Sequence, residues 1–234
     1  MQLSKRMELL ASKVTEGSRL ADVGTDHGYI PIVLVQRKRI PSAIAMDVNK
    51  GPLERANAHI HTCGLDTYIE TRLSDGLEKL KAEEADTVLI AGMGGGLTVR
   101  ILKGGEHCLS TVKELILQPQ SDIHLVREYL CRNHFRIVEE DMVLDEGKYY
   151  PMMKAVHGEA EEMDAAALFY GDRKLQKSPA VLREYIGAEL QKNRKIRDTL
   201  LENGQGESLR MHELEEKHAL LKSVLEQESD YEMQ

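Results

Sequence analysis

Leu20-Ala-Asp-Val-Gly-Thr-Asp-His-Gly28 carries the strongest fold signal in this chain. A short apolar run at 19–23 precedes two glycines, and a helix is expected to begin near Tyr29, so the order is strand, loop and helix. Dinucleotide-binding loops of the form G-x-G-x-x-G require glycine where this chain has Asp26 and Tyr29. Because a carboxylate at position 26 would repel a pyrophosphate held by backbone amides, the loop argues against NAD and FAD. It tolerates a cofactor with nearby positive charge, such as the sulfonium and ammonium groups of S-adenosylmethionine.

From Leu20 to Val156, short apolar strands alternate with helical segments, which is typical of an α/β domain with a largely parallel sheet. Only four residues separate the last two expected strands, 136–144 and 149–156; these suffice for a hairpin but not for a parallel crossover. Five parallel strands closed by an antiparallel hairpin is the order expected of a Rossmann-like class I methyltransferase sheet. The other expected strands are 19–23, 43–47, 68–73, 87–91 and 115–117, and the expected helices are 29–37, 52–62, 77–81, 97–102 and 123–133.

The C-terminal part has a different pattern. Residues 157–164 are acidic and lack periodicity, which suggests a linker, and Ser178-Pro179 resembles a helix cap followed by a first-turn proline. A helix to about Leu201 and a break at 203–206 lead to an apolar heptad seam, so we predict an antiparallel coiled-coil hairpin. The predicted domains are 1–160, which binds the cofactor, and 165–234. The seam consists of Met211, Leu214, His218, Leu221 and Leu225, facing Leu182, Ile186, Leu190, Ile196 and Leu200.

Composition indicates an ordinary cytosolic enzyme. Hydrophobic residues make up 41% of the 234-residue chain, enough for a core, and no apolar run is long enough to span a membrane or to form a signal peptide. Three widely spaced cysteines without a C-x-x-C pair suggest neither a disulfide framework nor a zinc site, so we expect no metal.

Charge is unevenly distributed. The net charge of −8 disfavours nucleic acid as a partner, but residues 173–197 contain eight basic and two acidic residues. That window can track RNA phosphates or can simply form a solvated helix surface. The RNA-binding candidates within it are Arg173, Lys174, Lys177, Lys192, Arg194, Lys195 and Arg197.

Polar and glycine residues follow the other expected strands. Asp47, 23 residues beyond Gly24, can accept both hydroxyl protons of a ribose or can cap the next helix. Asp75 can accept from an adenine amine or can serve only as a turn residue. The glycines around Met93 allow close approach of backbone to a ligand, and Met93 can pack on a methionine tail. The amides of Gln118-Pro-Gln120 can pair with a base edge or satisfy the loop backbone.

Six segments together resemble the bacterial tRNA (adenine-22-N1)-methyltransferase family, and the likeness spans essentially the whole chain. Gly28 stands where the family often has alanine, and Gln120 stands where it often has asparagine, which weakens a base-contact role for residue 120. The segments are Leu3-Ser-Lys-Arg6, Ala21-Asp-Val-Gly-Thr-Asp-His-Gly-Tyr-Ile-Pro31, Asp47-Val-Asn49, Ala91-Gly-Met-Gly-Gly95, Leu117-Gln-Pro119 and Glu146-Gly-Lys-Tyr-Tyr150.

The resemblance implies S-adenosylmethionine as cofactor, tRNA as partner and methyl transfer to N1 of an adenine. Since that nitrogen has an in-plane lone pair, the main requirement is positioning, and a carboxylate can stabilise the cationic product. Asp26 is the expected catalytic carboxylate, with Tyr29 orienting or stacking the base; alternatively Asp26 only caps a helix and contacts the cofactor's ammonium group. The expected cofactor-binding residues are Asp22, Gly24, Thr25, Asp26, His27, Gly28, Asp47, Val48, Asn49, Asp75, Gly76, Gly92, Met93 and Gly94.

Two other functions stay open from the sequence alone. One is a methyltransferase for a small metabolite or a protein, with the helical hairpin as a dimerisation arm. The other is a cofactor-bound RNA chaperone or scaffold without turnover, which the replacement of the loop glycine by Asp26 would allow.

Overall fold

The computed structural model describes residues 2–160 and 162–231, with side chains described as far as residue 226. The chain divides into two compact units, Met1–Glu162 and Met163–Gln234. No helix within the described residues is both long and apolar enough to cross a membrane.

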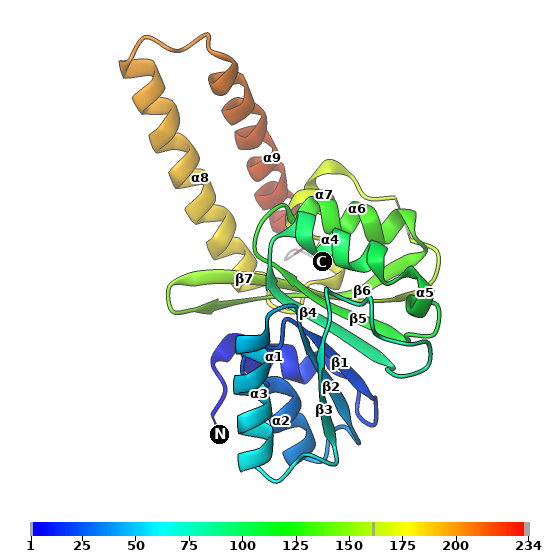
Figure 1. Cartoon of the computed structure of the whole chain (residues 1–234). Coiled ribbons are helices and arrows are strands. Elements are labelled where there is room, and N and C mark those ends of the chain that lie inside the picture. Colours follow the sequence, from blue (N-terminus) through cyan, green and yellow to red (C-terminus); the bar gives the residue numbers. More distant parts are fainter. Residues whose placement is uncertain (1, 161, 232–234) are drawn as a thin grey trace. The chain divides into compact units, whose positions relative to one another are not determined.

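The first unit is built on a seven-stranded sheet with the order β3-β2-β1-β4-β5-β7-β6 (Figure 1). Strands β3, β2, β1, β4 and β5 pair in parallel, whereas β7 pairs antiparallel with both β5 and β6. This order confirms the predicted class I methyltransferase sheet with its closing hairpin. The strands are β1 (Leu20–Val23), β2 (Ala43–Asp47), β3 (Ile69–Leu73), β4 (Thr87–Met93), β5 (Glu114–Pro119), β6 (Phe135–Asp145) and β7 (Lys148–His157).

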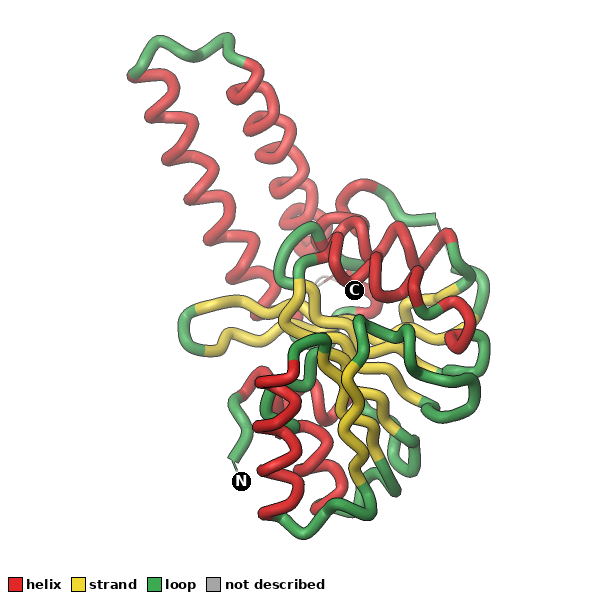
Figure 2. Tube along the Cα trace, in the orientation of Figure 1, coloured by secondary structure: helices red, strands yellow, loops and turns green. Residues whose placement is uncertain are grey.

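Helices cover both faces of this sheet (Figures 1 and 2), with α1, α2 and α3 on one face and α4, α5 and α6 on the other. Every residue of β1 and of β5 is therefore buried, as expected for central parallel strands. The helices are α1 (Lys5–Lys13), α2 (Tyr29–Gln36), α3 (Lys50–Thr62), α4 (Gly95–Gly104), α5 (Glu106–Leu109) and α6 (Ile123–Arg132).

Three features of this unit differ from the sequence prediction. The expected helix 77–81 is wrong: residues 77–79 form a turn and residues 80–81 have no regular secondary structure. The apolar residues that suggested the helix, Leu77 and Leu80, are buried in the core. Helices α1 and α5 were not predicted. Helix α1 begins after Ser4, whose side-chain oxygen accepts a hydrogen bond from the Met7 backbone N–H at 3.3 Å.

The loops after β4 and β5 interlock, and Gly95 makes this possible. The Gly95 N–H donates to the Ser121 carbonyl at 2.8 Å, and the Gln120 N–H donates to the Met93 carbonyl at 2.8 Å. A Cβ atom on Gly95 would lie 2.2 Å from the Asp122 carbonyl oxygen, which is backbone and cannot swing away. The position therefore accepts only glycine.

We expect Gly95→Ala to destabilise the protein by about 3 kcal/mol or more, because relieving the overlap requires moving a backbone segment. Gly96→Ala is the matched control, since its Cβ would meet no atom within 4 Å, and the same exchange inside a helix is neutral or stabilising. Urea unfolding of both variants, followed by circular dichroism, measures the difference. Equal stability of the two would contradict the close approach of the two loops.

The second unit contains α7 (Ala165–Tyr170), a 3₁₀ turn (Arg173–Leu175) and two long helices, α8 (Pro179–Glu202) and α9 (Leu209–Tyr231). Helix α8 begins at the predicted proline. Met211, Leu214 and Leu221 of the predicted seam are buried, and so is Asn193, which was not predicted. The Asn193 side-chain amide donates to the Leu214 carbonyl at 2.9 Å and fixes the register of the two helices. Coiled-coil geometry stays a prediction.

Candidate functional site

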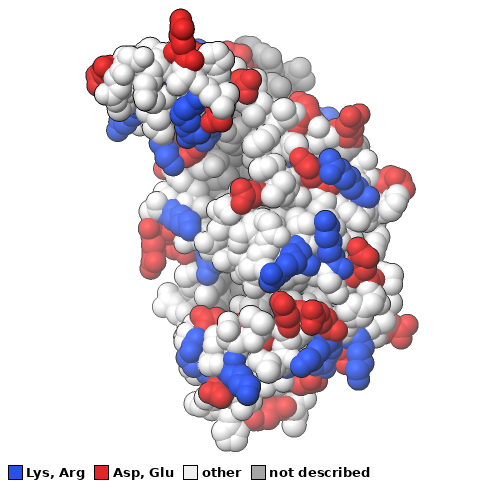
Figure 3. Space-filling model, turned by 45° about the horizontal axis from the view of Figure 1, so that its top comes forward, with Lys and Arg blue, Asp and Glu red and all other residues white. Residues whose placement is uncertain are grey.

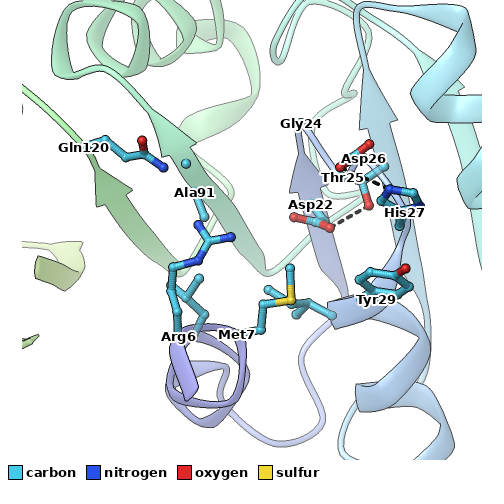
Figure 4. A pocket seen from close by; sticks show the side chains of 13 residues that line it. Arg6, Met7, Asp22, Gly24, Thr25, Asp26, His27, Tyr29, Ala91 and Gln120 are labelled. Carbon is cyan, nitrogen blue, oxygen red and sulfur yellow. Dashed lines mark hydrogen bonds and ion pairs between the residues drawn. The ribbon is translucent and has the colours of Figure 1, made fainter. Parts of the chain in front are cut away.

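A cavity of about 280 Å³ lies at the carboxyl ends of β1 and β4 (Figure 4). Helix α1 closes one side of the cavity, and the loop between β1 and α2 closes the other. The first residues of α2 also line the cavity. The lining residues are Arg6, Met7, Leu10, Asp22, Gly24, Thr25, Asp26, His27, Tyr29, Ile30, Ala91, Gly92 and Gln120. Most of the predicted loop residues are therefore brought together around one space.

The floor of the cavity is formed by the end of β1. Asp22 is buried and accepts a hydrogen bond from the Thr25 hydroxyl at 2.6 Å. Gly24 has φ +75°, and a Cβ atom there would lie 2.3 Å from the terminal methyl carbon of Met93. Met93 at the end of β4 thus packs directly against Gly24. Because Gly24 has no side chain, its backbone faces the cavity directly.

Burial raises the pKa of Asp22 to about 6, with the Thr25 hydrogen bond opposing the shift and the charge of Asp47 adding to it. A carboxyl group with a raised folded-state pKa contributes stability below its unfolded pKa and loses it as pH rises through the folded value. Relative to a carboxyl group with the ordinary aspartate pKa, the ionised Asp22 costs the ligand-free protein about 3 kcal/mol above pH 6.

Asp22→Asn is therefore expected to stabilise the ligand-free protein at pH 7.5 by up to about 3 kcal/mol, with the gain vanishing near pH 4. The reason is that asparagine keeps an acceptor for Thr25 but carries no buried charge. Urea unfolding at both pH values measures this, and Asp66→Asn, at an exposed position, serves as control. A loss of stability at pH 7.5 would show that the Asp22 charge is compensated within the protein.

Asp26 lies on the exposed rim of the cavity in a left-handed conformation with φ 49°. Its carboxylate accepts from the Arg55 guanidinium of α3 at 2.7 Å and lies 3.5 Å from Nε2 of His27. The alternative role of helix cap is wrong for Asp26, because the N-cap of α2 is Gly28. Within the part of the chain that the structure describes, the carboxylate of Asp26 thus has contacts to side chains and caps no helix.

Three aromatic rings stack next to Asp26. Tyr29 and His27 have ring centroids 5.0 Å apart with planes inclined by 8°, and His59 of α3 stacks on both. His59 Nδ1 lies 3.1 Å from the His27 carbonyl oxygen, which ties α3 to the loop. Neither Arg55 nor His59 was predicted, since only the folded chain brings α3 to this loop.

Gly94, also predicted to bind the cofactor, is the N-cap of α4 and does not line the cavity. The other predicted cofactor residues follow β2 and β3. Asp47 is buried, and its Oδ1 accepts from the Asn49 N–H at 2.8 Å, so it orders the loop before α3 while Asn49 itself is the N-cap. Val48 is 57% exposed. Asp75 lies 3.7 Å from the Arg100 guanidinium, and Gly76 has φ +55° with Ile101 packed against it. Within the described residues, none of these is among those that line the cavity.

Arg6 is a cavity residue to which the sequence assigned no role. Its guanidinium Nη1 donates to Gln118 Oε1 at 3.0 Å, and its Cζ lies 5.1 Å from the centroid of the Tyr150 ring. The sequence signal for Arg6 was its position in the segment Leu3-Ser-Lys-Arg6, which resembles the family. Gln118 and Tyr150 lie in two other segments that carry the same resemblance. Gln120, by contrast, is exposed and accepts from Lys148 at 3.2 Å.

The basic residues of the second unit differ in how they are paired. Lys192 lies 3.8 Å from Glu189, and Arg197 lies 3.7 Å from Glu215 of α9. Arg194 and Lys195 are exposed on α8. On the face drawn in Figure 3, basic and acidic side chains are interspersed. Arg173, Lys174 and Lys177 lie in or next to the 3₁₀ turn before α8.

Comparison with known proteins places these features in a family. Residues 3–153 match the model of a methyltransferase domain. The chain is 32% identical to the tRNA (adenine(22)-N(1))-methyltransferase of Bacillus subtilis, covering 97% of this chain and 98% of the relative. The crystal structure of the Bacillus subtilis m1A22 tRNA methyltransferase TrmK superposes with a TM-score of 0.82 at 31% identity, over 95% and 98% of the two chains. Sp1610 of Streptococcus pneumoniae, in complex with S-adenosyl-L-methionine, superposes with a TM-score of 0.85 at 33% identity, over 96% of this chain and 100% of Sp1610.

Proposed function

The chain belongs to the tRNA (adenine(22)-N(1))-methyltransferase family, and we propose that it transfers the methyl group of S-adenosylmethionine to N1 of adenine 22 in tRNA. The observation that supports this most is the loop at 24–28. There Asp26 replaces the glycine of dinucleotide loops and lies beside Tyr29 on the rim of the cavity.

The residues around the cavity fit S-adenosylmethionine. Asp47 has one carboxylate oxygen beyond the one that accepts from Asn49, and its position at the end of β2 suits a ribose diol. Gly24 and Met93 present a surface without a protruding side chain, and Sp1610 binds this cofactor on the same fold. When bound, S-adenosylmethionine supplies the electrophilic methyl group.

The acceptor side of the reaction needs little proton transfer. The lone pair of adenine N1 is available in the plane of the base, so the protein has to orient the base and stabilise the positive charge that develops on it. The Asp26 carboxylate is exposed and can face that charge or accept a proton from the exocyclic amine. The rings of Tyr29, His27 and His59 offer a stacking surface for a base turned out of the tRNA.

Tritiated S-adenosylmethionine and unmodified tRNA with adenine at position 22 test the proposal with the purified chain. We expect label in the tRNA and none when adenine 22 is replaced by guanine. Label that enters only small molecules or protein would support the alternative acceptor classes. The absence of any transfer, with cofactor binding intact, would leave the non-enzymatic scaffold.

A further inference from the structure

The hairpin of β6 and β7 reaches beyond the parallel part of the sheet. Strand β5 pairs with residues 153–156 of β7, whereas β6 pairs with β7 as far as Lys148. Residues 148–152 therefore extend by roughly 16 Å past the pairing with β5, on the side where the parallel strands end, and Figure 1 shows the hairpin projecting there. The cavity lies on the same side of the sheet.

The turn of this hairpin is tight and fixes the position of Lys148. Glu146 and Gly147 both have positive φ values, 48° and 76°, as in the two-residue type I′ turn that matches the twist of a hairpin. Asp145 and Lys148 are consequently paired across the hairpin. The backbone of Lys148 is thus held at the first residue of β7, while its side chain is exposed.

Neutral groups hold the ammonium group of Lys148. Its Nζ donates to Oε1 of Gln120 at 3.2 Å and lies 5.3 Å from the centroid of the Tyr150 ring. The carboxylate of Asp145 accepts from the backbone N–H of Arg6 at 2.9 Å, and no ion pair in the described part of the chain joins Lys148 to an acidic side chain. Since these contacts orient the ammonium group without neutralising it, its remaining donors are available to an anion.

This ammonium group lies at the mouth of the cavity. Gln120 lines the cavity, whereas Lys148, which it contacts, is not among the described residues that do so. Figure 4 places Gln120 on one side of the cavity and Asp26 and Tyr29 on the opposite side. A nucleotide whose base enters toward Asp26 leaves its phosphates outside, because burying their charge would be costly. The anion nearest to Lys148 would then be the RNA backbone.

Resting on the proposed function, we propose that Lys148 binds a phosphodiester group that adjoins adenine 22 of the tRNA. The two sides of the mouth thereby divide the charges of the substrate: Asp26 faces the base, which becomes cationic, and Lys148 faces the anionic backbone. Lys148 is thus a substrate-binding residue, and Gln120 and Tyr150 are positioning residues that act through it.

Binding of unmodified tRNA at several salt concentrations tests the contact. We expect Lys148→Gln to weaken binding by about three- to tenfold at low salt and to make the slope of log affinity against log salt concentration shallower by about one. Lys148→Arg should keep the slope, because it keeps the charge. The affinity for S-adenosylmethionine, measured by calorimetry, should stay within about twofold in both variants, since Lys148 lies outside the cavity.

Lys103→Gln is the matched control. Lys103 is also an exposed lysine of the first unit, but it lies in the last turn of α4, a helix that starts just after β4 and leads away from the carboxyl ends of the strands. Its loss changes the net charge by the same amount and should leave the salt slope unchanged. Thermal melting of each variant shows that it is folded.

A tRNA assembled from synthetic pieces locates the contact. An uncharged methylphosphonate is placed at the linkage before or after adenine 22, one at a time. One of the two should weaken binding to the wild-type chain by about three- to tenfold and should not weaken binding to Lys148→Gln any further, because the two changes remove the same interaction.

Three results would overturn the proposal: an unchanged salt slope in Lys148→Gln, an equal effect of Lys103→Gln, or effects of Lys148→Gln and of both methylphosphonates that simply add. Weaker binding of S-adenosylmethionine to Lys148→Gln would also overturn it and assign the lysine to the cofactor. The proposed function fails separately. A wild-type chain that shows the shared loss at adenine 22 but transfers no methyl group contradicts the function and leaves the role of Lys148 standing.

Discussion

Asp26→Asn is expected to lower the turnover number for tRNA methylation by about 10²- to 10³-fold, the range for loss of a positioned charge or proton acceptor. The affinity for S-adenosylmethionine should change by less than about threefold, because an exposed carboxylate paired with a side chain contributes little to ground-state binding. The reason is that the positive charge on the base exists only from the transition state onward. Asparagine keeps the shape of the side chain and removes the charge that faces the base.

Single-turnover rates and calorimetric cofactor affinities measure the two effects separately. Asp66→Asn is the matched control, because Asp66 is also exposed and also pairs with a basic side chain, His61. Equal loss of turnover and of cofactor affinity would demote Asp26 to a cofactor ligand. Arg55→Gln gives a second check, since it removes the 2.7 Å contact between the Arg55 guanidinium and Asp26 but keeps the Asp26 carboxylate itself.

The second large effect is expected on tRNA binding. Reversing the charges of Arg194 and Lys195 together should weaken binding to tRNA by about tenfold or more at low salt. If each residue contacts one phosphate, the slope of log affinity against log salt concentration should become shallower by about one to two. These two residues are exposed on α8, whereas Arg197 pairs with Glu215, so reversing Arg197 would also disturb the helical hairpin. The affinity should be measured at two salt concentrations.

Arg210→Glu combined with Lys222→Glu is the control, because it reverses two charges on α9 in the same unit. Arg210 pairs with Glu213 of its own helix, so its reversal breaks no contact between α8 and α9. If both double variants weaken tRNA binding equally, the effect belongs to net charge and the α8 surface has no special role. If neither does, the basic window is a solvated helix face, as the sequence allowed.

The parallel sheet could be predicted because its evidence is local. Each strand is an apolar run that ends in turn residues, and the four residues between the last two strands permit only a hairpin. The start of α8 was also local, since proline favours a first helical turn. The segment 77–81 shows the limit of this approach: Leu77 and Leu80 have spacing compatible with a helix, but Gly105 packs so closely on Leu77 that the segment is shaped by tertiary contact.

The candidate site was predictable only in part, because some of its residues are neighbours in sequence and others meet only through tertiary contacts. Loop residues such as Asp22 and Asp26 are close in sequence, so their meeting at one cavity follows from the strand and loop order. Arg6 reaches Gln118 across 112 positions and Arg55 reaches Asp26 across 29, and no periodicity encodes such contacts. The family motifs marked Arg6 and Gln118 but could not say that they touch.

The most direct test of the proposed function is the position of the methyl group on the product. The purified chain is incubated with S-adenosylmethionine and an unmodified tRNA transcript, and N1-methyladenine is mapped by reverse transcription, which the modified Watson-Crick edge blocks, and by mass spectrometry of nuclease fragments. We predict a single N1-methyladenine at position 22 and none in the transcript with guanine there. Methylation at another position or on another atom, or an unmodified transcript with cofactor bound, would contradict the proposed function.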